Sequence, residues 1–149
     1  MAHTFVKDVM KKNVITIDSS MTIKDAASMM DDANVGCIII TTNNIPSGIL
    51  TERDFVKRIA AKNKALSTPV SEVMSSPLIT IEPEETVWEA AETMKQKGVH
   101  KLPVHEGNKV IGIITTTDIV KICSIGSDSS MRHICDQILL RIKDTKSSR

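Results

Sequence analysis

The sequence predicts an α+β fold, an α/β-type repeat in which one β-α-β-β-α unit occurs twice, and three observations predict it. The segment from Gly48 to Asp54 recurs from Gly112 to Asp118, 64 residues later. Residues 6–59 align with residues 70–123 at the same spacing without a gap. Within each copy, apolar residues pass from strand-like runs to helical three- and four-residue spacing. Because a unit of about 60 residues is marginal alone, we expect the copies to share one core.

The elements of the first copy follow from its hydrophobic pattern. β-branched residues favour strands, whereas apolar residues at Ile23, Ala26 and Met30 share one helix face. Asn43, Asn44 and Pro46 are expected to break the chain between two strands. The predicted elements are a lead-in helix over 4–12, strands over 14–17, 36–40 and 48–50, and helices over 22–33 and 51–61.

The second copy repeats this order and is followed by a tail. Gly98 is the expected left-handed end of its first helix. Apolar residues on one side of the tail predict a last helix over about 129–143, outside the repeat. The elements predicted in the second copy are strands over 78–81, 100–104 and 110–114, and helices over 86–97 and 116–124.

Composition excludes several classes of protein. Hydrophobic residues make up 41% and charged residues 25%, as in globular proteins, and no apolar run approaches the roughly 20 residues of a membrane span. The start of the chain does not resemble a signal peptide, so we expect a cytoplasmic protein without a membrane partner. A net charge of +1, with no Tyr, one Trp and two Phe, disfavours a nucleic-acid partner.

The repeated polar motif is Thr-x-x-Asp, at Thr51/Asp54 and Thr115/Asp118. One interpretation is a helix-capping box, since Thr22/Asp25 has the same spacing without the preceding Gly-Ile strand. The other is a ligand site, because a carboxylate where a strand ends and a helix begins can accept hydrogen bonds from a vicinal diol. The spacing alone leaves both interpretations open.

Catalytic and metal chemistry have no recognisable motif in this sequence. There is no nucleophile paired with a base and no glycine-rich phosphate loop. His133 and Cys135 follow no zinc-binding pattern. We therefore expect neither an enzyme with catalytic residues nor a resident catalytic cofactor or metal.

The ordered set of motifs resembles the tandem cystathionine β-synthase (CBS) domain pair, or Bateman module. The resemblance covers residues 5–123 and rests on Val9-Met10 and Val73-Met74, the Ile-Thr-Ile strands, the Ala-Ala-x-x-Met helices and the two Gly-Ile-x-Thr-x-x-Asp segments. It implies two CBS units packed through their sheets with pseudo-twofold symmetry. The implied division is CBS domain 1 at 5–62, a linker at 63–69, CBS domain 2 at 70–124, and a C-terminal helix and tail at 125–149.

The resemblance also implies an adenosine-containing regulatory ligand, such as AMP, ADP, ATP or S-adenosylmethionine, in clefts between the units. Each expected site combines a Thr-x-x-Asp pair for the ribose with aliphatic residues around the adenine. The first site would consist of Asp118, Thr115, Ile113, Ile15, Val35, His100 and Lys101. The second would consist of Asp54, Thr51, Arg53, Ile49, Ile79 and Val99.

The two expected sites differ in charge, which favours the Asp118 site. His100 and Lys101 would face phosphates there, whereas Gly36 and Cys37 occupy the matching positions of the first copy. Two functions remain open at this point. One is a ligand-sensing module, a homodimer that signals to an unidentified regulated protein, and the other is a ligand-free interaction module that mediates dimerisation or docking.

Overall fold

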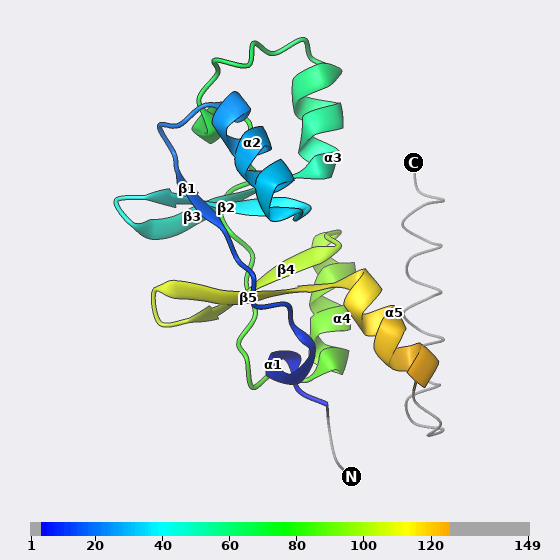
Figure 1. Cartoon of the computed structure of the whole chain (residues 1–149). Coiled ribbons are helices and arrows are strands. Elements are labelled where there is room, and N and C mark those ends of the chain that lie inside the picture. Colours follow the sequence, from blue (N-terminus) through cyan, green and yellow to red (C-terminus); the bar gives the residue numbers. More distant parts are fainter. Residues whose placement is uncertain (1–3, 126–149) are drawn as a thin grey trace. The chain divides into compact units, whose positions relative to one another are not determined.

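The computed structural model describes residues 4–125 (Figure 1). The tail helix predicted near 129–143 lies outside these residues. The described elements, in chain order, are α1 (Val6–Val9), β1 (Thr16–Asp18), α2 (Ile23–Ala33), β2 (Cys37–Thr42), β3 (Ile45–Thr51), α3 (Glu52–Asp54), the π-helical segment η1 (Phe55–Ala60), the 3-10 turn η2 (Val70–Glu72), α4 (Val87–Lys97), β4 (Lys101–Glu106), β5 (Lys109–Thr115) and α5 (Thr116–Ile125).

The described chain divides into two compact units, and each unit is built from segments that are not contiguous in the sequence. The Asp54 unit contains residues 13–79 and 107–110, and the Asp118 unit contains residues 4–12, 80–106 and 111–125. The lead-in helix α1 therefore belongs to the unit built from the second copy, and the lead-in turn η2 belongs to the unit built from the first copy. The two copies have exchanged their lead-in segments.

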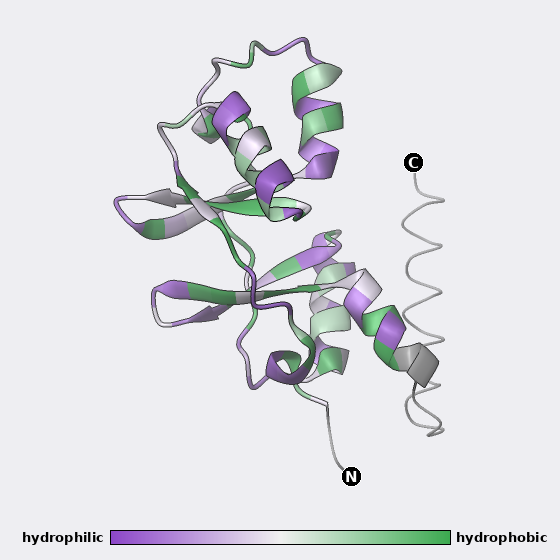
Figure 2. Ribbon diagram, in the orientation of Figure 1, coloured by the Kyte–Doolittle hydropathy of each residue, from purple (hydrophilic) through white to green (hydrophobic). Residues whose placement is uncertain are grey.

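The Asp54 unit is a three-stranded sheet with helices on one face. β1 pairs parallel to β2, and β2 pairs antiparallel to β3. α2 and α3 lie on the same face of this sheet (Figure 1), and hydrophobic residues occur on both the strands and the helices (Figure 2). The core of the unit consists of Ile17, Ile23, Ala26, Met30, Ile38, Ile40, Leu50, Ile59, Val70 and Val73.

The hairpin between β2 and β3 is tighter than the sequence predicts. Its turn is formed by Asn43 and Asn44 alone, with φ of 53° and 65°, the left-handed pair that matches the twist of a two-residue hairpin. The expectation that Pro46 breaks the chain is wrong, because Pro46 lies within β3 opposite Thr41. The register shifts between Ile40 and Thr41, so this bulge accommodates a residue that has no N–H to donate.

The Asp118 unit has a two-stranded sheet, β4 and β5, with α1, α4 and α5. The strand predicted over 78–81 is wrong, because only Ile81 bridges to Val104. In the first copy, the Ile39 amide donates to the Ile15 carbonyl at 3.0 Å. Pro103 occupies the position that matches Ile39 and has no N–H, so the second copy cannot form this ladder bond.

Each exchanged lead-in segment pairs with a strand of the unit that it joins. Lys11 and Ile113 exchange both backbone hydrogen bonds at 2.9 Å. In the Asp54 unit, Ser75 and Ile49 form the matching pair at 2.9 and 3.1 Å. The two copies therefore build the same edge contact, each with the other's lead-in.

Gly48 and Gly112 allow this close approach of the lead-in segments. A methyl group added at Gly48 would lie 2.6 Å from the Met74 sulfur and 2.9 Å from the Ser75 carbonyl oxygen. At Gly112, the added methyl would lie 2.8 Å from Met10 Cγ and would clash with its sulfur. In each unit, the Val-Met motif of one copy therefore packs against the Gly-Ile motif of the other copy.

We predict that Gly48→Ala destabilises the protein by about 1–3 kcal/mol, since an inserted methyl overpacks the contact with Met74. Urea unfolding of the single variants and of Gly48→Ala/Met74→Ala measures the coupling between the two positions. The double variant should recover only part of the stability that Gly48→Ala loses, because the Ser75 carbonyl remains close to the added methyl. A Gly48→Ala variant as stable as the wild type would contradict the contact.

Candidate functional site

Both Thr-x-x-Asp motifs form helix caps. The Thr115 amide donates to Asp118 Oδ2 at 3.0 Å, and the Asp118 amide donates to Thr115 Oγ1 at 3.1 Å. The Thr51 amide donates to Asp54 Oδ2 at 2.9 Å, and the Asp54 amide donates to Thr51 Oγ1 at 3.4 Å. The capping interpretation is therefore confirmed, and it engages the Oδ2 atom of each carboxylate.

Burial separates these two carboxylates from the other capping boxes. Thr22 with Asp25 and Thr86 with Glu89 form the same reciprocal pairs. Asp25 is half-buried and Glu89 is exposed, whereas Asp54 and Asp118 are only 8% and 6% exposed. They are the buried charged residues of the described chain. A cap does not require this burial, and burial of a carboxylate is unfavourable unless the charge is compensated.

Different cations compensate the two buried carboxylates. Lys11 Nζ lies 3.8 Å from Asp118 Oδ1, and the Lys11 side chain is 58% exposed. Arg58 Nε lies 3.4 Å from Asp54 Oδ1, and the Arg58 side chain is 50% exposed. In both copies, therefore, Oδ2 belongs to the cap and Oδ1 faces a basic side chain.

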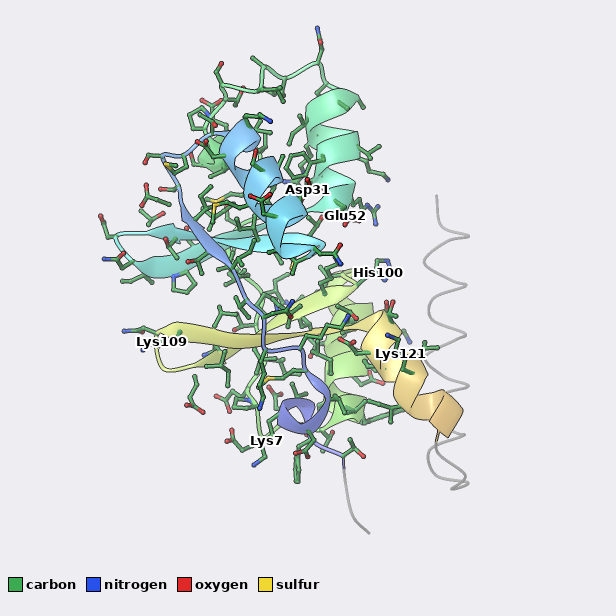
Figure 3. All side chains as sticks on the ribbon, viewed as in Figure 1. Lys7, Asp31, Glu52, His100, Lys109 and Lys121 are labelled. Carbon is green, nitrogen blue, oxygen red and sulfur yellow. The ribbon has the colours of Figure 1, made fainter. Side chains whose placement is uncertain are left out.

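The residues predicted for the Asp118 site fall in both units. Asp118, Thr115, Ile113, His100 and Lys101 belong to the Asp118 unit, and Ile15 and Val35 belong to the Asp54 unit. The His100 carbonyl accepts a hydrogen bond from the Thr116 amide at 3.0 Å, which fixes the start of β4 beside the first turn of α5. Figure 3 shows His100 at this end of β4. The structure thus brings His100 and the Thr115/Asp118 pair to neighbouring backbone positions.

The residues predicted for the Asp54 site are divided in the same way. Asp54, Thr51, Arg53, Ile49 and Ile79 belong to the Asp54 unit, and Val99 belongs to the Asp118 unit. Arg53 is exposed, and Ile49 is half-buried next to the cap.

Sequence reasoning missed the two cations that face the carboxylates. The i, i+4 spacing from Asp54 to Arg58 is a helical ion-pair signal and could have identified Arg58. Lys11 had no comparable signal, because it reaches Asp118 only through the exchange of lead-in segments.

No helix within residues 4–125 is both long and apolar enough to cross a bilayer. No cluster of three or more His, Cys, Asp or Glu side chains in this part of the chain is arranged to hold a metal ion.

Comparison with known proteins identifies the family. The CBS domain model matches residues 6–61 and again residues 70–125. The CBS domain-containing protein YhcV of Bacillus subtilis is 37% identical over 114 residues, which cover 76% of this chain and 81% of YhcV. The chain therefore belongs to the CBS domain family, and it contains two CBS domains, which confirms the resemblance and the fold class predicted from the repeat.

Solved structures show the same fold. The CBS domain pair of protein MJ0100, in complex with 5-methylthioadenosine and S-adenosyl-L-methionine, has a TM-score of 0.74 and 30% identity, covering 83% of this chain and 98% of that one. The CBS domain protein PAE2072 of Pyrobaculum aerophilum, complexed with AMP, has a TM-score of 0.73 over 89% and 98% of the two chains. At 20% identity, PAE2072 shows the fold alone.

The share of each relative that this chain covers varies. Beside the 81% of YhcV, it spans 32% and 24% of the length of two other curated relatives. In such relatives the matching segment is one part of a longer protein.

The half-buried capping box of Thr22 and Asp25 offers a test of how strongly these hydrogen bonds act on a carboxylate. Hydrogen bonds from the Thr22 hydroxyl and amide hold the pKa of Asp25 below its ordinary value of 3.8. We predict that Thr22→Val raises the pKa of Asp25 toward 3.8, because it keeps the hydrogen bond from the amide of residue 22 and removes the one from the hydroxyl. Carboxyl-carbon NMR titration measures this shift.

The sign of the stability effect follows from this direction. A pKa lowered by folding stabilises the protein above the unfolded value, and the contribution is lost as the pH falls through the folded pKa. Thr22→Val should therefore lower stability at neutral pH and have less effect in acid. The pKa of Asp18, lowered by Ser20, is the internal control and should not change. An unchanged pKa of Asp25 would contradict the prediction.

Proposed function

We propose that this chain is a non-catalytic regulatory module that binds an adenosine-containing ligand, AMP, ADP, ATP or S-adenosylmethionine, with Asp118 holding the ribose hydroxyls. Ligand binding would change the module's fit to a partner protein. The proposal keeps the residues of the predicted Asp118 site, with the aliphatic residues Ile113, Ile15 and Val35 around the adenine.

The burial of Asp118 carries the proposal. Its carboxylate is almost fully removed from water, yet the cap engages only Oδ2. The cation beside Oδ1 makes a single contact at 3.8 Å and has a largely exposed side chain. A vicinal diol can donate charge-assisted hydrogen bonds directly to this oxygen, at shorter range than the 3.8 Å contact of Lys11.

Two further observations support the proposal. The structure of the related MJ0100 pair contains 5-methylthioadenosine and S-adenosyl-L-methionine, both of which have a ribose and an adenine. In this chain, the hydrogen bond between Thr116 and His100 puts an imidazole-bearing residue beside the same helix start. Lys101 follows it and adds a positive charge to this end of β4.

The alternative function, a ligand-free interaction module, rests on the completed caps. Thr115 and Thr51 already satisfy one oxygen of each carboxylate without a ligand. Under this alternative, Asp118 contributes to stability alone. Binding measurements separate the two functions.

We predict that one of AMP, ATP and S-adenosylmethionine binds the wild type and that Asp118→Ala lowers its affinity tenfold or more. Loss of a charge-assisted contact to the diol costs about 1.5–3 kcal/mol. Isothermal titration calorimetry measures the affinity, and thermal unfolding confirms that the variant is folded.

Asp25→Ala is the matched control, because it removes a capping carboxylate at a position outside the proposed site. It should lower stability and leave the affinity unchanged. If the folded wild type binds none of the three ligands and Asp118→Ala changes only its stability, the interaction module is the correct function.

We also propose that the module acts as a homodimer on a separate regulated protein. Val56 on η1 and Ile45 on β3 are 65% and 54% exposed, which leaves apolar surface for association. Light scattering at tens of micromolar should give twice the sequence mass. A monomeric mass at that concentration would contradict the homodimer.

A further inference from the structure

The two copies share one capping geometry but hold their second carboxylate oxygen in different ways. Arg58 Nε lies 3.4 Å from Asp54 Oδ1. The Nη1 atom of the same guanidinium donates to the Val73 carbonyl at 3.3 Å and to the Met74 carbonyl at 3.1 Å. Arg58 therefore links the capping carboxylate to the lead-in segment of the second copy.

These contacts fix Arg58 more firmly than Lys11 is fixed. A planar guanidinium that faces one carboxylate and two carbonyls has three partners from two directions. Lys11 has one ionic contact at 3.8 Å with Asp118. A ligand can displace a lysine from a single contact more readily than an arginine that must leave all three partners together.

Arg58 lies in a segment whose helix type differs between the two copies. Directly after Asp54 the chain enters the π-helical segment η1, in which the Ala61 amide donates to the Val56 carbonyl at 2.9 Å. α5 continues as an α-helix through the matching positions. The residue that matches Arg58 is the half-buried Ile122, which cannot compensate Asp118.

We propose that Arg58 closes the Asp54 carboxylate to ligands, so that it determines which of the two copies binds. With Oδ2 in the cap and Oδ1 on Arg58, Asp54 has both oxygens engaged, and a ribose diol would have to break the Arg58 contacts. Asp118 has only the loosely held Lys11 at the same place. This inference rests on the proposed function, since it concerns the same diol chemistry, and it assigns one ligand to each chain.

Separate variants at positions 58 and 122 test the inference. Calorimetry with AMP, ATP and S-adenosylmethionine should give one site per chain in the wild type, lost in Asp118→Ala and kept in Asp54→Ala. Arg58→Met retains an apolar stem and removes the guanidinium, so it should give two sites per chain. The second site should disappear in Arg58→Met/Asp54→Ala.

The reciprocal variant and a control complete the experiment. Ile122→Arg puts a guanidinium beside Asp118 and should weaken wild-type binding tenfold or more. Lys57→Met removes an exposed neighbouring cation and should leave both affinity and stoichiometry unchanged. Arg58→Lys, which cannot reach all three partners, replaces Arg58→Met if thermal unfolding shows that the latter does not fold.

The outcomes distinguish this inference from the proposed function. Two sites in the wild type, or one site in a folded Arg58→Met, would overturn the closure by Arg58 and leave the Asp118 site in place. If the wild type binds no ligand and Arg58→Met binds one, the Asp118 site is overturned and the proposal that Arg58 closes Asp54 is supported. Absence of binding in both proteins would overturn both proposals.

Discussion

The close approach of Met10 to Gly112, and of Met74 to Gly48, is the contact on which each unit depends. Neither glycine can carry a side chain while a methionine and a backbone carbonyl lie at that distance. The contact brings a lead-in segment alongside a strand, where Lys11 pairs with Ile113 through two backbone hydrogen bonds. Because each lead-in comes from the other copy, neither unit is complete when its own repeat is considered alone.

This exchange also determines the surroundings of the buried carboxylates. Lys11 reaches Asp118 because its segment pairs beside the strand that ends at Thr115. The carbonyls that hold Arg58 belong to Val73 and Met74, in the other lead-in segment. Both ion pairs therefore depend on the same kind of backbone pairing. Lys11 lies in one lead-in segment, whereas Arg58 is hydrogen-bonded to two carbonyls of the other lead-in segment.

Prediction from sequence worked best where local pattern determines structure. The helix over 22–33 was expected from its apolar face and begins after the Thr22 cap, and Gly98 ends α4 in the left-handed conformation, as expected. Two errors in strand prediction occurred at prolines. Pro46 was accommodated in β3 by a bulge, and Pro103 removed a ladder bond from the pairing expected for the second copy. A proline changes pairing with a partner strand, so its effect depends on residues that are distant in sequence.

The sequence by itself determined that one unit is made twice, that the family is that of the CBS domain, and that Thr-x-x-Asp recurs where a strand meets a helix. These features are periodic or local, and repetition makes them visible in one chain. Only the tertiary structure decided that Asp54 and Asp118 are buried while Asp25 is half-buried, and that Arg58 and Lys11 are their partners. Burial and ion pairing depend on contacts between segments far apart in the sequence, and identical spacing therefore gives caps with different chemical properties.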